Sequence, residues 1–202
     1  RTTKKFTGKG DVPVVEGLYR DYFEGVTSSA TTLNFSALQW GDAEALALAK
    51  VLPRYACVVE LDLSENRIAS DGLKGIADAV NVIPSLTEVL SPFCSTPASS
   101  LSLTHPPLCL AWTLQLNLSY NQLCGLWRGA GTYTAEGITA IADALKGNGS
   151  LTSLDISMNK IGSEGAKAIA EGLKDNGSLT ALDARYNDLG DDGKRGLQEA
   201  VD

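Results

Sequence analysis

The side chains that most often carry out catalysis are scarce in this sequence. The chain holds one histidine, His105, and four cysteines at irregular spacing, so it lacks the parts of a histidine-based catalytic triad or a CxxC-type metal site. No GxxxxGK[ST] motif is present, and no dinucleotide-binding glycine motif follows a predicted strand. Carboxylates are plentiful, but they recur at fixed intervals, which indicates a structural duty. We therefore predict no enzyme, no metal site and no cofactor.

Composition narrows the classes of partner. With 202 residues and a formal net charge of −7, the chain is long enough for one domain and disfavours nucleic acid and anionic membranes as partners. No stretch approaches the roughly 18 apolar residues of a membrane-spanning helix, and irregular cysteines favour a reducing compartment. We expect a cytoplasmic protein. The basic residues 1–5 leave open a disordered tail or an organellar protein after removal of a transit peptide.

The elements that position the carboxylates repeat every 28 residues. Residues 150–177, SLTSLDISMNKIGSEGAKAIAEGLKDNG, read as a strand, a turn, a helix and a return loop, and another copy begins at Ser178. Internal repeats of this length indicate a solenoid. The five predicted strands begin at Leu33, Leu61, Leu116, Leu154 and Leu182. The first three predicted helices cover residues 42–52, 71–82 and about 135–146.

An asparagine recurs where the later strands must turn. Leu154, Ile156 and Ile161 alternate toward the predicted core, so the amide of the neighbouring Asn159 is buried with them. A buried amide can bond backbone groups of its own and the adjacent repeat, and leaving such groups unpaired costs about 1–3 kcal/mol each. We predict a structural asparagine ladder, formed by Asn66, Asn121, Asn159 and Asn187.

An acidic residue followed by glycine marks the start of the later helices. The carboxylate suits the positive end of a helix, and the glycine lets the helix pack close to its neighbour. The pairs are Asp71-Gly72, Glu136-Gly137, Glu164-Gly165 and Asp192-Gly193.

The repeated pattern LxxLxLxxNxI resembles the leucine-rich repeat. A 28-residue period with a full helix is similar to the ribonuclease-inhibitor-like class, which includes the C-terminal domains of NOD-like receptors and the Ran GTPase-activating proteins. The resemblance covers roughly residues 31–202. It implies an α/β solenoid, a segment of a right-handed horseshoe with five repeats, a parallel concave sheet and convex helices.

The ends of the array depart from the repeat. Residues 1–30 are expected to form an N-terminal tail and a capping helix that begins near Asp11, before the leucine-rich repeat domain of residues 31–202. In the last helix, Lys194 and Gln198 stand where the preceding repeat has alanine. A more polar terminal helix is typical of a capping repeat.

Residues 89–115 interrupt the rhythm. The segment contains no Asp, Glu, Lys or Arg, and removing its 27 residues restores the 28-residue spacing between Asn66 and Asn121. It is rich in residues with pyrimidine-rich codons and is bounded by residues whose codons can supply intron borders. Two hypotheses remain open: a translated, unspliced intron, or a Ser/Pro-rich binding loop. Sequencing the transcript distinguishes them.

A second interruption, residues 124–134, lies between a strand and its helix. Its ten extra residues place it on one rim of the solenoid as a loop. Trp127, Arg128 and Tyr133 are residue types enriched at binding hot spots. The rim loop is therefore either a partner-binding element or a loop folded locally around its tryptophan.

The concave face is the default partner-binding surface of the predicted solenoid. Its middle column, Asn34-Asp62-Asn117-Asp155-Asp183, forms an acidic and polar ridge that suits a basic partner, although such residues also keep a sheet soluble. The predicted concave binding residues are Glu60, Asp62, Ser64, Asn117, Ser119, Ser153, Asp155, Ser157, Asp183 and Arg185.

These features predict a non-catalytic interaction or scaffold module that binds another protein, within a larger assembly or alone. Resemblance to the Ran GTPase-activating proteins offers a regulator of a small GTPase as an alternative. A sensor fragment of a NOD-like receptor and a peripheral subunit of a larger complex are further alternatives.

Overall fold

A computed structural model describes residues 22–27, 29–55, 57–82, 114–126 and 131–201. Most of the predicted N-terminal tail and capping helix, most of the predicted insertion, and His105, Trp127 and Arg128 lie outside these residues. Residues 22–27 are helical and lead into the first strand. In the described part of the chain, no helix combines the length and apolar character needed to cross a bilayer.

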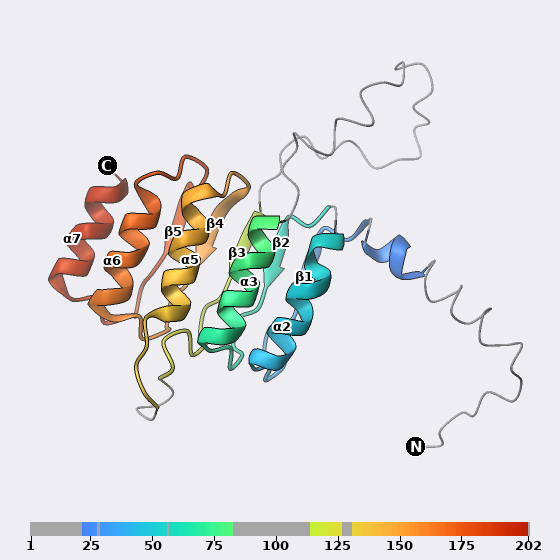
Figure 1. Cartoon of the computed structure of the whole chain (residues 1–202), viewed down its shortest axis with the longest axis horizontal. Helices are drawn as coiled ribbons and strands as arrows, with labels where there is room; N and C mark the ends of the chain where they lie inside the picture. Colours follow the sequence, from blue (N-terminus) through green and yellow to red (C-terminus); the bar gives the residue numbers. More distant parts are fainter. Residues whose placement is uncertain (1–21, 28, 56, 83–113, 127–130, 202) are drawn as a thin grey trace, which may run out of the picture.

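Strands and helices alternate along the chain, and the five strands form one sheet in sequence order (Figure 1). The strands are β1 (Thr32–Asn34), β2 (Glu60–Asp62), β3 (Leu114–Asn117), β4 (Leu151–Asp155) and β5 (Ala181–Asp183). The helices are α2 (Asp42–Val51), the short 3-10 helix η1 (Leu52–Arg54), α3 (Ser70–Val82), α5 (Glu136–Gly147), α6 (Gly162–Leu173) and α7 (Gly190–Val201).

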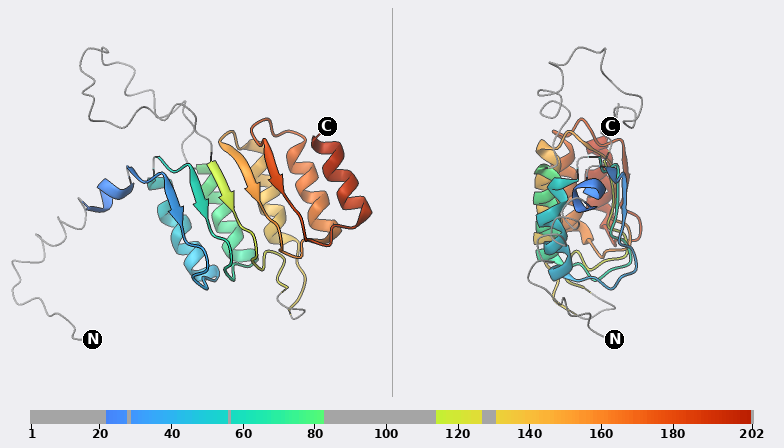
Figure 2. Two further views of the ribbon diagram at one scale, coloured as in Figure 1. Left: turned by 180° about the vertical axis from the view of Figure 1, so that it is seen from behind. Right: turned by 90° about the vertical axis from the view of Figure 1, so that its right-hand side faces the viewer.

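The strands are parallel and in register at the predicted leucines. Leu61 is paired with Leu33 and Leu116, and Leu154 is paired with Leu116 and Leu182. Helices cover one face of the sheet and leave the other face uncovered (Figure 2). The predicted α/β solenoid of five strands alternating with helices is confirmed.

Burial follows the alternation that the repeat predicts. Leu61 and Leu63 are fully buried, and Leu154, Ile156 and Ile161 are each 1% exposed. Because side chains of a strand point alternately to its two faces, the residues between them lie on the uncovered face. The core therefore fills the space between sheet and helices.

The third strand begins earlier than the sequence suggested. Leu114 and Gln115, the last two residues of the predicted insertion, lie in β3, where Gln115 pairs with Glu60. Leu114 pairs with Leu151 and is buried, and the register with β4 shifts between Leu114 and Gln115. These two residues continue the sheet because they supply the alternating buried and exposed positions that the strand needs.

Glycines at the helix starts mark close contacts between neighbouring helices. A Cβ atom on Gly137 would lie 2.8 Å from the Cα of Ser70 and 2.9 Å from the carbonyl oxygen of Leu123. On Gly72, it would lie 2.9 Å from the Cα of Asp42. Position 44, which corresponds to Gly72 one repeat earlier, holds glutamate. Each of these two glycines therefore allows the start of its helix to pack closely against the preceding repeat.

This packing is tested by two substitutions within α5. Gly137→Ala should lower the free energy of unfolding by about 1–3 kcal/mol, because overpacking against backbone forces the helix outward. Gly147→Ala, at a position with no atom within 4 Å of the added Cβ, should leave stability unchanged or raise it by up to about 1 kcal/mol. Urea unfolding measures both. Equal effects would contradict the helix packing described here.

Candidate functional site

Buried asparagine amides join the repeats at the end of the strands. The side-chain nitrogen of Asn159 donates to the carbonyl oxygens of Ile156 and Ser157 in its own repeat, at 3.0 and 2.9 Å, and of Leu118 in the preceding repeat, at 2.9 Å. Its side-chain oxygen accepts from the backbone N–H of Asn121 at 2.9 Å. Asn159 has no solvent exposure, so water cannot replace these bonds.

The other ladder asparagines bond in the same direction, toward the preceding repeat. Asn187 accepts from the N–H groups of Asn159 and Ile161, and Asn66 accepts from those of Leu38 and Trp40. Leu38 occupies the ladder position of the first repeat and is 51% exposed. No repeat is described before the first one, so an asparagine at position 38 would find no carbonyl oxygen of a preceding repeat to bond in the described structure.

The acidic ridge of the concave face also has a local structural duty. One side-chain oxygen of Asp62, Asn117, Asp155 and Asp183 accepts a hydrogen bond from the backbone N–H two residues later, at 2.9–3.0 Å. This short ring caps the end of each strand. The same bond gives the four side chains a common orientation relative to their strands.

Ser64 is a correction to the predicted binding face, because only 8% of it is exposed. Its carbonyl oxygen accepts from the N–H of Ala37 and from the Asn66 side chain. The equivalent Ser119 and Ser157 are half-buried, as is Ser153, whereas Glu60 and Arg185 are exposed.

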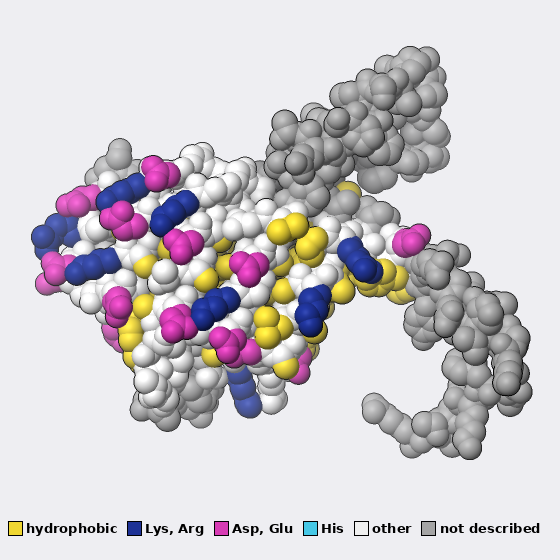
Figure 3. All heavy atoms as spheres, viewed as in Figure 1, with side chains coloured by type: hydrophobic (Ala, Val, Ile, Leu, Met, Phe, Trp, Pro, Cys, Tyr) yellow, Lys and Arg dark blue, Asp and Glu magenta, His cyan; other side chains and the backbone are white. Residues whose placement is uncertain are grey.

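Charge is unevenly distributed along the ridge. Arg185 forms an ion pair with Asp183 on the last strand and, by hydrogen bonding, holds the pKa of that carboxyl below its usual value. Glu60, Asp62 and Asp155 make the middle of the face acidic. On the opposite, helical face, basic and acidic side chains alternate over the C-terminal helices (Figure 3).

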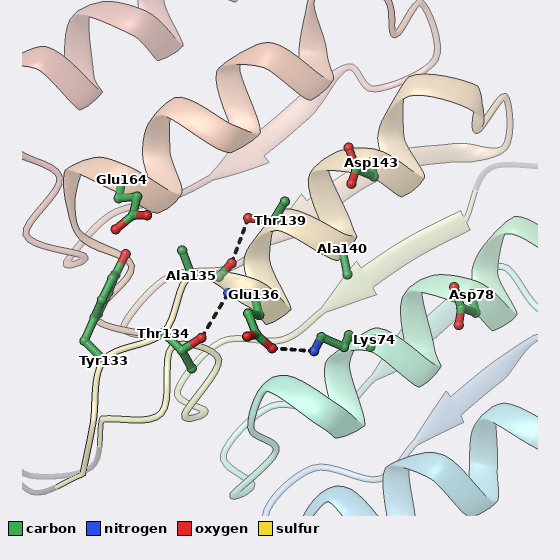
Figure 4. A pocket seen from close by; sticks show the side chains of 10 residues that line it. All are labelled: Lys74, Asp78, Tyr133, Thr134, Ala135, Glu136, Thr139, Ala140, Asp143 and Glu164. Carbon is green, nitrogen blue, oxygen red and sulfur yellow. Dashed lines mark hydrogen bonds and ion pairs between the residues drawn. The ribbon is translucent and has the colours of Figure 1, made fainter.

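The described part of the rim loop is held against the repeats. Tyr133 is partly buried and donates its hydroxyl proton to the carbonyl oxygen of Ile161 at 2.7 Å. Cys124 is buried beneath it, and desolvation raises the pKa of that thiol to about 11. Tyr133 borders a hollow of about 740 Å³ (Figure 4). Lys74 and Glu136 also line this hollow and form an ion pair with each other at 2.6 Å.

Sequence reasoning missed a row of exposed apolar side chains at the edge of the concave face. Tyr120, Met158 and Tyr186 are 46%, 45% and 69% exposed. Each directly precedes a ladder asparagine. That shared position was the signal available in the sequence, because residues at one position of successive repeats lie side by side. We call these three residues the apolar row.

Comparison with known proteins identifies the class of fold. A family model described as Leucine Rich repeat matches residues 56–77 and 147–170. A solved structure of leiomodin-1 actin-binding site 2 is 17% identical over 90% of this chain and 84% of that chain, with a TM-score of 0.61. The C-terminal domain of tropomodulin from Caenorhabditis elegans is 11% identical over 90% of both chains, with a TM-score of 0.59.

The repeats are therefore leucine-rich repeats, and the chain is a leucine-rich repeat protein. A search of curated proteins gave no match. The two structures described above include neither a NOD-like receptor nor a Ran GTPase-activating protein, so the finer resemblance stays a prediction.

Two substitutions in the same repeat distinguish the contribution of the ladder to stability from that of the ridge. Asn159→Leu should lower the free energy of unfolding by at least about 3 kcal/mol, because several buried backbone groups lose their partners at about 1–3 kcal/mol each. Asp155→Ala removes one bond at a half-buried residue and should cost about 0.5–1.5 kcal/mol. Thermal and urea unfolding measure both, and similar losses would sink the assignment of the ladder.

Proposed function

We propose that this protein is a non-catalytic protein-binding module whose concave face binds a basic surface of a partner protein. The observation that carries the proposal is the fixed orientation of Asp62 and Asp155 in the middle column of one sheet. Each carboxylate uses one oxygen to cap its own strand. The two are separated by the neutral Asn117, which has the same geometry.

Fixed carboxylates favour binding because little side-chain freedom is lost when a partner docks. A row of like charges on one face also steers a cationic partner and selects against an anionic one. Glu60 adds a further carboxylate at the opposite end of β2. The face therefore offers acidic groups at set positions, whereas the helical face mixes both signs.

The size of the face limits how tightly it binds alone. Five parallel strands at about 4.8 Å spacing span roughly 24 Å, whereas a stable interface buries around 800 Å² of each partner. The proposed interface therefore extends beyond the strands onto an adjoining surface. The apolar row and Tyr133 of the rim loop lie on the side where the chain turns toward the helices. Trp127 and Arg128, the other predicted binding residues of the rim loop, lie outside the described residues.

Actin is the first defined partner to test, because one structural neighbour is named as an actin-binding site. The likeness to that neighbour concerns the fold. Co-sedimentation with actin filaments therefore forms one arm of the experiment, beside capture of partners under mild cross-linking and identification by mass spectrometry.

The double variant Asp62→Asn/Asp155→Asn tests the acidic face without disturbing the sheet. Asparagine at the equivalent position 117 already accepts the same backbone bond, so the strand caps remain while two negative charges are removed. The affinity for the partner, measured by isothermal titration calorimetry, should fall at least about tenfold, and the loss should shrink at high salt.

The matched control is Asp143→Asn/Glu171→Gln. It removes the same charge from two exposed residues of the helical face, each paired with a lysine three residues along. Its affinity should equal that of the unchanged protein. Equal losses in the two double variants would show that net charge matters and the concave face does not.

A further inference from the structure

The three residues of the apolar row share an unusual backbone conformation. Tyr120, Met158 and Tyr186 have φ angles of 56°, 57° and 59°, in the left-handed region where bulky residues are rare. Ala37 and Glu65 hold the same position in the first two repeats, with φ angles of 56° and 55°. The C-terminal half of the array thus carries large apolar side chains at a position where glycine would be less strained.

Backbone bonds between repeats lock the row in place. The N–H of Tyr120 donates to the carbonyl oxygen of Ser157, and the N–H of Met158 donates to that of Arg185, both at 3.0 Å. Each row residue is followed by a buried ladder asparagine. The three side chains therefore leave the protein from fixed points on adjacent repeats, about 4.8 Å apart.

The surroundings of the apolar row differ between its side and its C-terminal end. On one side lies the ridge, three residues earlier in each repeat, where Asn117, Asp155 and Asp183 precede Tyr120, Met158 and Tyr186. At the C-terminal end, Tyr186 borders a hollow of about 550 Å³ that Leu189 and Lys194 also line. The Asp155 carboxylate lies on the side of the ridge, with Asp62 on strand β2 beyond Asn117. The strip is therefore complementary to an apolar strip that carries cations on one flank.

Spacing decides between an extended and a helical ligand. Side chains on one face of an extended strand recur at about 6.8 Å, so three of them overshoot the row by about 4 Å. Successive turns of an α-helix recur at about 5.4 Å, so three anchors overshoot by only about 1 Å. A helix therefore places one anchor on each repeat.

We propose that the apolar row docks an amphipathic helix of the partner protein, with apolar residues at i, i+4 and i+7 against Tyr120, Met158 and Tyr186. Lysine or arginine on the flank of that helix faces Asp155 and Asp62. This inference rests on the proposed function and names the chemistry of the partner.

The experiment uses the only methionine of the chain, Met158, as a reporter at the centre of the row. Labelling with ¹³C-methyl methionine gives one methyl signal in the NMR spectrum of the full chain. The probe is a synthetic helical 16-residue peptide with leucine at i, i+4, i+7 and i+11 and lysine along one flank. Its titration should shift the Met158 signal saturably.

Two variants and one peptide make the result specific. Tyr186→Ser should weaken peptide binding at least about tenfold, as the loss of an aromatic anchor does at interface hot spots. Val82→Ser changes an exposed apolar residue at the end of α3 and should leave binding unchanged. A peptide with glutamate in place of lysine should bind at least about tenfold more weakly.

An unshifted Met158 signal at saturating peptide, or equal binding by Tyr186→Ser and Val82→Ser, would overturn the proposal. Failure of the proposed function gives a different pattern. If Asp62→Asn/Asp155→Asn loses the captured partner while Tyr186→Ser retains it, the acidic face binds and the apolar row does not. If the capture is indifferent to both variants, the concave face is not the binding surface at all.

Discussion

The structure depends on one hydrogen-bonding constraint: every strand after the first ends in a turn whose backbone groups are buried with no water to bond. The ladder asparagines supply the missing partners, and each one bonds both its own turn and the turn before it. The repeats are therefore joined by polar bonds as well as by apolar packing. Because the bonds point backward, the array has a direction, and the exposed Leu38 marks its first turn.

This constraint also explains where the chain tolerates extra residues. The ten additional residues after Asn121 leave the repeat once the ladder bonds are complete and rejoin it before α5. At the base of this loop, Gly125 and Gly131 have positive φ angles and approach so closely that neither has room for a Cβ. The loop therefore closes on itself, and Tyr133 bonds it to the next repeat. An insertion between the strand and its ladder asparagine would instead break the bonds that join two repeats.

The sequence revealed features whose cause lies in the residues themselves. Leucine alternation and the 28-residue period predicted the strands and their order, because each repeat must present the same face to the core. Burial of Ser64 could not be seen in this way, because the equivalent Ser119 and Ser157 make the same carbonyl bonds and are only half-buried. The boundary at Leu114 was missed because an insertion's end and a strand's first residues have similar composition. A second pair of turn asparagines, Asn148 and Asn176, was also overlooked, although both stand in the sequence NGSL.

The ladder and the apolar row are two consequences of the same turn. The residue at this position takes the left-handed conformation whatever its side chain is, and Ala37 does so although Leu38, not an asparagine, follows it. The turn itself therefore sets the conformation. Alanine, glutamate, tyrosine and methionine all occupy this position with φ angles between 55° and 59°. The backbone is thus indifferent to the chemistry that it displays, so that scaffold and surface vary separately. The strongest sequence signals in this chain consequently describe the scaffold. The residues that determine the partner stand at positions where the repeat does not require a particular side chain.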